Sequence, residues 1–500
     1  MMAKTKYYNK IKIIYILYFS CFCLPPFCHA QNILKSSSEY LFNSKANITW
    51  CGKNASQNVF SFAKNESKNK KIHIQTFSDS MQVLGTFKLK PSSRKSRIIH
   101  TLAFNNHLLL ITKRHDVFKA HNTVYIEKYG YDGKAIGEPI KIAQTPLKSY
   151  KDDGEFIIDQ SPDKSKTLLF NTDYNAMGEF TMNINVFDDD GNLFYDTAVV
   201  PGYTNDNVDI EEIQLDNEGN FYMLSNEYLD SVYRKIPLKY KHSLHYYNNA
   251  EKTMTRLIIP SESYYIKQTT FLLDKKLHKI IVQGFQGPAE SDKIDGMFHC
   301  EFSLQTPELL QTKNHNFNDS DRVKFLGNRV YYFSSDLKDY YIKNFYRFEN
   351  GKTLLVAEKF YTSQQSTNYY VNGTLQPTYR TIYIYNEIIL VCLDSVGNLC
   401  WKEAINKNQS TLNDDGIFSS FTCMLQPDKV IFYYNKLDRK SSGIIEVTVM
   451  EDGRMTERSL SQSADDETMI VPIESRQTTK DQMLMITQEN KNYAIWKLMF

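Results

Sequence analysis

The sequence predicts an all-β protein folded as a β-propeller, with seven four-stranded blades as the preferred number and six or eight as alternatives. Three observations lead to this prediction. Short segments with alternating apolar and polar residues follow one another along most of the chain, and turn residues separate them. Long amphipathic helices are hard to find. The pattern of strands and turns also recurs at intervals of about 50–60 residues, which is typical of propeller repeats.

Tight hairpins are the strongest local signal. Asp-Gly or Asn-Gly pairs interrupt alternating segments at Asp132-Gly133, Asp190-Gly191, Asn350-Gly351 and Asp452-Gly453. Both central residues of a two-residue hairpin turn need positive φ, which Asn, Asp and Gly tolerate. The segment ILVCLDSVGNLCWKEA, residues 389–404, follows the same plan around Gly397-Asn398. It is therefore predicted to be the outer hairpin of one blade.

The repeating units divide the chain almost completely. Each unit has an apolar strand, a polar turn, a strongly apolar strand and a closing hairpin, and the units are placed at 97–150, 152–203, 206–262, 264–318, 324–406 and 412–462. The remaining pieces, 40–95 and 463–500, are expected to combine into one blade, so that the two termini close the ring. Residues 31–500 then form a single domain. The alternative is two consecutive β-sandwich domains, but no linker rich in Pro, Gly or Ser divides the chain.

The N-terminal segment has the pattern of a secretory signal peptide, residues 1–30. Four lysines between Lys4 and Lys12 precede an apolar core, Ile13–Leu24, and Cys28-His29-Ala30 places small side chains before a cleavage site after Ala30. A lipoprotein signal that uses Cys21 is the alternative, although Tyr18 and Phe19 are bulky for it. No later segment is apolar for long enough to span a membrane. The protein is thus expected to be exported, to the periplasm or outside the cell.

Charge and cysteine content exclude several classes of protein. The net charge of +2 gives no electrostatic basis for binding nucleic acid. Five cysteines remain after signal removal, an odd and scattered set that does not form a disulfide framework. Cys392 and Cys400, on the two arms of one hairpin, could form a cross-strand disulfide, although two small apolar residues in a sheet is the preferred interpretation. No zinc-binding spacing occurs, and neither a metal nor a cofactor is predicted.

Motifs of common enzyme classes are also missing from the sequence. There is no G-x-S-x-G, H-E-x-x-H, P-loop or G-x-G-x-x-G motif. Adjacent carboxylates such as Glu211-Glu212 are weak evidence for a site, because neighbours on a strand point to opposite faces. No catalytic residue is therefore assigned. Propeller glycosidases take their catalytic carboxylates from different blades, so no single motif would show them. The glycosidase class therefore stays open.

A tyrosine-rich insertion is the best candidate for a binding surface. Tyr361, Tyr369, Tyr370 and Tyr379 lie among Ser, Thr, Asn and Gln in a polar segment between two strands. Tyrosine offers a flat apolar face and a hydroxyl at low entropic cost, which suits the binding of protein or carbohydrate. The alternative is an elongated hairpin that packs its own aromatic side chains.

Two segments resemble known families. SPDKSKTLLF, residues 161–170, resembles the Ser-Pro-Asp turn of TolB-like and WD40-like propeller repeats. GKTLLVAEKFY, followed by YIYNEIILVCLDSVGNLCWKEAINKNQS, resembles exported propeller-like proteins of Bacteroidota-type bacteria that have no assigned activity. These resemblances imply a fold and a location in the cell envelope, and they imply no reaction.

Three functions remain open from the sequence. The preferred one is a non-enzymatic exported propeller that binds a protein or glycan partner. The second is a glycan hydrolase or lyase with carboxylates or His in the central funnel, and the third is a structural envelope component that recruits partners by strand addition or loops. The fold alone cannot separate them, because propellers host both enzymes and binding proteins. Converging acidic, His and Arg side chains at the ring axis would favour the enzyme.

Overall fold

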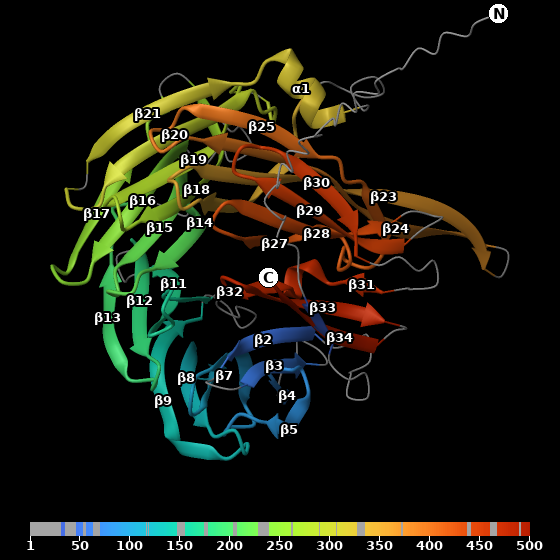
Figure 1. Cartoon of the computed structure of the whole chain (residues 1–500). Coiled ribbons are helices and arrows are strands. Elements are labelled where there is room, and N and C mark those ends of the chain that lie inside the picture. Colours follow the sequence, from blue (N-terminus) through green and yellow to red (C-terminus); the bar gives the residue numbers. More distant parts are fainter. Residues whose placement is uncertain are drawn as a thin grey trace, which may run out of the picture.

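The computed structural model consists of antiparallel β-sheets arranged around a common centre (Figure 1). It describes residues 32–35, 47–53, 57–63, 71–116, 118, 120–147, 156–174, 179–203, 208–228, 240–261, 264–289, 291–306, 308–327, 336–371, 374–437, 442–460, 468–489 and 492–500. These residues form eight sheets, six with four strands and two with five. The predicted β-propeller fold is confirmed by this arrangement. The predicted signal peptide, residues 1–30, lies outside the described residues.

The first four sheets each contain four strands that are consecutive in the chain, and each strand pairs with the next. Sheet 1 contains β2 (Asn47–Lys53), β3 (Gln57–Ala63), β4 (Ile72–Ser78) and β5 (Val83–Leu89). Sheet 2 contains β6 (Ser96–Ala103), β7 (Leu108–Asp116), β8 (His121–Tyr129) and β9 (Ala135–Pro146). Sheet 3 contains β10 (Ile157–Gln160), β11 (Lys166–Tyr174), β12 (Phe180–Asp188) and β13 (Leu193–Val199). Sheet 4 contains β14 (Val208–Leu215), β15 (Phe221–Tyr228), β16 (Tyr240–Asn248) and β17 (Thr253–Ile258).

The next three sheets follow the same order. Sheet 5 contains β18 (Tyr265–Asp274), β19 (Lys279–Gly287), β20 (Gly296–Ser303) and β21 (Leu309–Asn316). Sheet 6 contains β22 (Tyr340–Arg347), β23 (Thr353–Val371), β24 (Thr374–Leu393) and β25 (Leu399–Ile405), and β26 (Gln409–Leu412) pairs with β24. Sheet 7 contains β27 (Thr422–Leu425), β28 (Lys429–Leu437), β29 (Ser442–Met450) and β30 (Met455–Ser459). The six predicted units therefore correspond to sheets 2 to 7.

Sheet 8 combines the two ends of the chain. It contains β31 (Met469–Ile470), β32 (Arg476–Thr479), β33 (Gln482–Glu489) and β34 (Asn492–Met499) together with β1 (Asn32–Lys35). Strand β1 pairs antiparallel with β34, from Asn32 opposite Met499 to Lys35 opposite Trp496. The Lys35 ammonium also lies 4.2 Å from the centre of the Trp496 ring. The two ends of the chain thus meet in one sheet, but through β1, which precedes the residues 40–95 that were predicted to combine with the C-terminal piece.

The preferred number of seven blades is one fewer than the eight sheets that the described residues form. The sequence interpretation merged residues 40–95 and 463–500 into one blade, whereas the structure places them in sheets 1 and 8. Strands β2 and β3 have seven residues each, as many as β4 and β5, so length does not explain why they were missed. Three consecutive residues of β3, Asn58, Val59 and Phe60, are buried, so this strand lacks the alternation on which the prediction depended.

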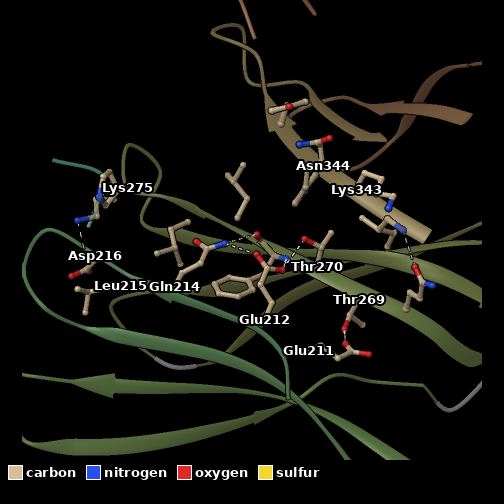
Figure 2. A pocket seen from close by; sticks show the side chains of 18 of the residues that line it. Glu211, Glu212, Gln214, Leu215, Asp216, Thr269, Thr270, Lys275, Lys343 and Asn344 are labelled. Atoms are coloured by element: carbon tan, nitrogen blue, oxygen red, sulfur yellow. Dashed lines mark hydrogen bonds and ion pairs between the residues drawn. The ribbon is translucent and has the colours of Figure 1, made fainter. Parts of the chain in front are cut away.

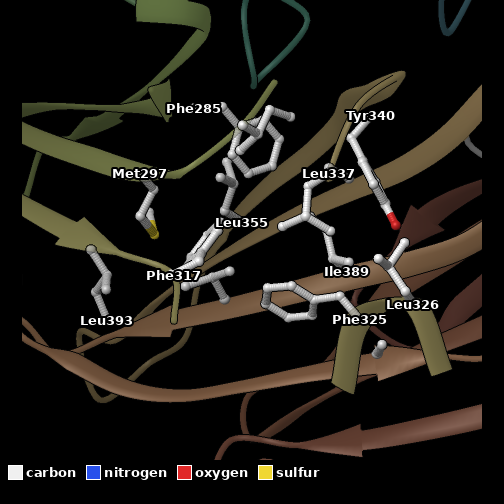
Figure 3. Close-up of a cluster of buried hydrophobic side chains, with 14 residues drawn as sticks. Phe285, Met297, Phe317, Phe325, Leu326, Leu337, Tyr340, Leu355, Ile389 and Leu393 are labelled. Carbon is white, nitrogen blue, oxygen red and sulfur yellow. The ribbon is translucent and has the colours of Figure 1, made fainter. Parts of the chain in front are cut away.

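The apolar core is divided among the interfaces between sheets. Eight clusters of buried side chains lie among the described residues, and each joins two sheets that are neighbours in the ring. Figure 3 shows the cluster between sheets 5 and 6, where Met297 of β20 and Leu355 of β23 pack with Phe325. Because both faces of a sheet are covered in this way, central strands such as β7 are apolar at consecutive positions.

The ring is closed by the cluster between sheets 8 and 1. Phe60 and Phe77 of sheet 1 pack with Leu484, Ile486 and Ile495 of sheet 8. In Figure 1 the red strands β33 and β34 accordingly lie beside the blue strands of sheet 1. Every sheet therefore has two neighbours, and the same hydrophobic contact that joins consecutive sheets also joins the last sheet to the first.

One short helix, α1 (Asp319–Leu326), lies between sheets 5 and 6. Its N-terminus has a capping box, in which the Asn318 side chain accepts from the backbone N–H of Asp321 and the Asp321 carboxylate accepts from the backbone N–H of Asn318. Phe325 and Leu326 extend from α1 into the cluster of Figure 3. The helices in the described part of the chain include none with the length and apolar character that crossing a membrane requires.

We predict that Phe60→Ala opens the contact that closes the ring. The Phe60 side chain has 0% exposed surface. The centres of the Phe60 and Phe77 rings are 5.6 Å apart, in an edge-to-face arrangement. Its truncation should lower the free energy of unfolding by about 3–5 kcal/mol, measured by urea denaturation. Tyr379→Ala, on a side chain that is 67% exposed, is the control and should change this free energy by at most about 0.5 kcal/mol. Equal effects of the two substitutions would contradict the closed ring.

Candidate functional site

The first strands of the sheets line the centre of the ring. Strand β14 contacts β10 and β18, β18 contacts β22, and β27 contacts β32. Two cavities are bounded by these strands. Cavity 1, of about 750 Å³, is lined by β14, β18 and β22, and cavity 2, of about 730 Å³, is lined by β22, β27 and the start of β32. Both cavities are lined by Lys343, Asn344 and Tyr346, so they meet at β22.

β-Bulges interrupt the first strands, which form the wall of the space at the centre of the ring, called the channel below. The register of the first strand shifts by one residue in five sheets, where the extra residues are Cys51, Ile99, Glu211, Lys267 and Lys343. A bulge interrupts the alternation of side chains between the two faces of a strand. Glu211 and Glu212 both line cavity 1 for this reason (Figure 2). The expectation that these neighbours point to opposite faces is therefore wrong at this position.

Glu211 occupies a desolvated position beside sheet 5. Its carboxylate accepts hydrogen bonds from the Asn226 side chain at 2.6 Å and from the Thr269 hydroxyl. The imidazole of His242 lies 3.9 Å from the same carboxylate. Burial raises the pKa of Glu211 to about 7, against the opposing effect of the hydrogen bond from Asn226, and the nearby Glu212 charge adds to the increase.

Glu212 reaches the neighbouring strand β18. It accepts hydrogen bonds from the Thr270 hydroxyl at 2.9 Å and from the Phe271 backbone N–H at 3.3 Å, while its other oxygen accepts from Gln214 at 2.8 Å. Burial raises the pKa of Glu212, although the bonds from Gln214 and Thr270 partly offset this effect. Figure 2 shows these side chains on one wall of cavity 1.

Hydrogen bonds from a backbone N–H of one first strand to a side chain of the adjacent sheet recur around the ring. Asp159 of β10 accepts from the Leu215 backbone N–H of the next sheet at 2.9 Å, and Gln268 of β18 accepts from the Ile342 N–H at 2.8 Å. Gln477 of β32 accepts from the Leu425 N–H at 3.0 Å. Glu212 is thus one of a series of side chains that satisfy the first strand of a neighbouring sheet. This similarity favours a structural role for Glu212 over acid–base catalysis.

A buried ion pair lies behind cavity 2. The ammonium of Lys407 is 2.7 Å from the Glu358 carboxylate, and neither side chain has exposed surface. Glu358 also accepts from the Ser420 hydroxyl at 2.6 Å, and Lys407 donates to Gln409 at 2.8 Å. Burial lowers the pKa of Lys407, while the Glu358 charge opposes this change. Lys343 lies 4.0 Å from Glu358 on the channel side and extends this charged group to the cavity wall.

The four predicted tyrosines lie on the hairpin of β23 and β24, which extends from sheet 6 (Figure 1). Tyr361 is 38% and Tyr379 is 67% exposed. The register pairs Tyr361 with Ile384 and Tyr379 with Ser366, so these two tyrosines lie on opposite faces of the hairpin. Tyr369 and Tyr370 are on the β23 arm, but their side chains are outside the described part of the structure. Tyr361 also lines a separate cavity of about 620 Å³ with Lys359 and Asn408.

The cysteines of the described residues are free thiols. Cys392 and Cys400 lie on paired strands, and a hydrogen bond joins their thiols. A disulfide between them therefore stays a prediction. Burial raises the pKa of Cys392. No group of three His, Cys, Asp or Glu side chains with metal-binding geometry occurs within the described ranges.

Comparison with known proteins gives no family. No family model matches the chain, and no curated protein matches it. Solved structures with a similar arrangement include Sqt1 from Chaetomium thermophilum, bound to the N-terminus of ribosomal protein L10, at 10% identity and a TM-score of 0.41, covering 93% of this chain and 100% of that one. Prolyl oligopeptidase B from Galerina marginata has 9% identity and a TM-score of 0.42, covering 89% of this chain and 56% of that one. The β-propeller domain of the Trilobed protease from Pyrococcus furiosus has 8% identity and a TM-score of 0.34, covering 82% and 96%. Such distant likenesses carry no argument about activity.

We expect the stability of the protein to fall with increasing pH because of Glu211. The pKa of this group rises from 4.5 to about 7 in the folded state, so the folded protein holds a proton that the unfolded chain releases. The resulting stability is present below pH 4.5 and is lost as the pH approaches 7, by about 3 kcal/mol at most. Unfolding of Glu211→Gln should lack this part of the pH dependence. Glu138→Gln, on an exposed side chain of β9, should keep it, and identical pH profiles for both variants would contradict the assignment.

We also expect Lys407→Met to destabilise the protein strongly. The substitution leaves the Glu358 carboxylate buried without its cation, which should lower the free energy of unfolding by about 3–5 kcal/mol. The double variant Lys407→Met/Glu358→Gln should regain part of this loss in urea denaturation. Lys324→Met removes an ion pair whose lysine is 47% exposed and should cost less than about 1 kcal/mol. A loss that the second substitution does not reduce would contradict the proposed pairing.

Proposed function

We propose that this protein is an exported, non-enzymatic propeller that binds a protein partner through the free end of the β23–β24 hairpin. The observation that carries the proposal is the length of this hairpin. Strand β22 pairs with β23 only as far as Lys359, opposite Tyr340, whereas β23 continues to Val371. Side chains 361–367 are all exposed. Such an extension adds little to the core of sheet 6 and therefore suits recognition.

Beyond Lys359, the outer edge of β23 pairs with no strand among the described residues. From Tyr361 to Val371 its sequence, YTSQQSTNYYV, contains no charged residue and no proline. Exposed edges in monomeric proteins are usually blocked by charges, prolines or bulges, because unpaired N–H and C=O groups attract a further strand. An extended peptide of the partner would add to this edge by main-chain hydrogen bonds, with Tyr side chains providing contacts on both faces.

Export rests on the N-terminal segment. The predicted cleavage site after Ala30 lies directly before β1, which begins at Asn32. Removal of residues 1–30 would thus leave the strand that completes sheet 8. The proposed place of action is the periplasm or the outside of the cell.

A glycan hydrolase or lyase with its active site in the channel is the second candidate. Cavity 1 favours it, because Glu211 lies in its wall with a pKa of about 7, a value suited to general acid–base catalysis. Against it, the oxygens of Glu211 and Glu212 accept hydrogen bonds from Asn226, Thr269 and Thr270 of the protein itself. Cleavage of a glycan panel that Glu211→Gln abolishes would establish the enzyme.

Binding through the hairpin can be tested by shortening it. Gln364 and Thr381 are register partners, so residues 365–380 can be replaced with Asn-Gly as a two-residue turn. The change spares the pairing of β24 with β26 and the hydrogen bond from the Thr381 N–H to Asn413. We predict an unfolding temperature within a few degrees of the wild type and loss of the partner in photo-crosslinking of the producing cells.

The crosslinking compares three sites of a photoreactive residue. At Tyr361 and Tyr379 it should give a defined adduct with one protein, and at Leu193, which is 48% exposed on sheet 3, it should give none. The same adduct from Leu193, or an adduct that persists when the hairpin is shortened, would overturn the proposal. An adduct that contains glycan and no protein would overturn the proposal that the partner is a protein.

A further inference from the structure

Two cationic side chains lie beside the indole group of Trp50, near the centre around which the sheets are arranged. The Lys164 ammonium lies 4.6 Å from the centre of the Trp50 ring, and the Arg476 guanidinium lies 5.7 Å from it. The three residues come from different sheets: Trp50 from β2, Lys164 from the turn between β10 and β11, and Arg476 from β32. Arg476 also lines cavity 2, which opens the group to a ligand.

The positive charges of this group have no counterion within the described residues. Neither Lys164 nor Arg476 forms an ion pair there, whereas Lys275 and Lys343 in the wall of cavity 1 pair with Glu218 and Glu358. The adjacent carboxylate, Asp163, accepts from the Ser161 and Ser165 hydroxyls and the Ser165 backbone N–H, which fixes the turn. Two like charges beside a shared apolar ring repel each other unless an anion lies between or beside them.

The environment of neighbouring groups agrees with an uncompensated positive charge. Burial and the nearby Arg476 charge lower the pKa of Lys164. The same two causes lower the pKa of His100, on β6, to about 4. The indole N–H of Trp50 is buried and has no acceptor within the described structure. A buried donor without a partner is costly, and a ligand oxygen could satisfy it.

We propose that Lys164 and Arg476, beside Trp50, form a binding site for an oxyanion group, a carboxylate or a phosphate, of a ligand that enters through cavity 2. The planar guanidinium of Arg476 presents paired donors that match two oxygens of such a group. Lys164, from the turn between β10 and β11, adds an ammonium beside the same indole ring. The site lies apart from the free end of the β23–β24 hairpin, residues 361–382, and does not depend on the proposed partner.

The site can be tested by titration with simple anions. The probes are sodium phosphate and sodium acetate, each compared with sodium chloride at equal ionic strength and constant pH, on the full mature chain. Intrinsic fluorescence reports on Trp50, since the chain has three tryptophans and Trp401 and Trp496 donate to Glu451 and Glu489 away from this group. We expect a saturable change with one or both probes. Saturation by phosphate alone identifies a phosphate ligand, and saturation by acetate identifies a carboxylate ligand.

Matched variants assign the response. Arg476→Gln and Lys164→Gln should each weaken the apparent affinity at least tenfold, and Trp50→Phe should remove the fluorescence signal while calorimetry still detects binding. Lys480→Gln is the control, because Lys480 follows β32 in sheet 8 but is 82% exposed and lies near Glu349. Thermal unfolding verifies that each variant is folded. No saturable response in the wild type, or equal affinity in Arg476→Gln and Lys480→Gln, would overturn the site and leave Lys164 and Arg476 as structural partners of Trp50.

Discussion

The structure depends on the burial of both faces of every sheet against its two neighbours. A four-stranded sheet cannot cover its own apolar surface. Water is excluded from that surface by the eight interfaces between neighbouring sheets. The contact of sheet 8 with sheet 1 is equivalent to the other seven, so no sheet is left with an uncovered face. This requirement explains why the central strands are apolar at successive positions. In the outermost strands, such as β5 and β13, most residues are half-buried or exposed, in partial alternation.

The first strands create a second requirement at the centre. They lie side by side without a backbone ladder between sheets, so their N–H groups need other acceptors. Side chains of Asp159, Glu212, Gln268 and Gln477 supply them from the adjacent sheet. Polar residues at the axis are thus largely occupied in holding the ring. The group of Trp50, Lys164 and Arg476 differs, because its donors are not matched by acceptors of the described chain.

Sequence reasoning recovered the parts of the fold that depend on local chemistry. In Asp190-Gly191 and Asn350-Gly351 only the glycines have positive φ, so the expected two-residue turn with two positive φ angles is wrong there. The glycines nevertheless mark the turns, so the hairpins and six of the units could be located. The bulge at Glu211 was overlooked although it leaves a mark on the alternation, because the apolar residues of β14 are two apart up to Ile210 and three apart from Ile210 to Ile213. The convergence of Lys164 and Arg476 was missed because these residues are far apart in sequence and only the ring brings them together. Composition alone indicated a polar insertion with Tyr361 and Tyr379 as candidate binding residues, and an elongated hairpin that packs its own aromatic side chains was the alternative. The structure has the elongated hairpin, but Tyr361 and Tyr379 are exposed on it.

Strand β1 gives the ring a particular order of assembly. Its partner β34 is among the last residues of the chain, so β1 has no strand to pair with until synthesis is nearly complete. The other sheets form from neighbouring segments, whereas this one requires contacts across almost the whole length of the chain, which are slow to form. Completion of sheet 8 is therefore expected to be the last step of folding, after the whole chain has been synthesised.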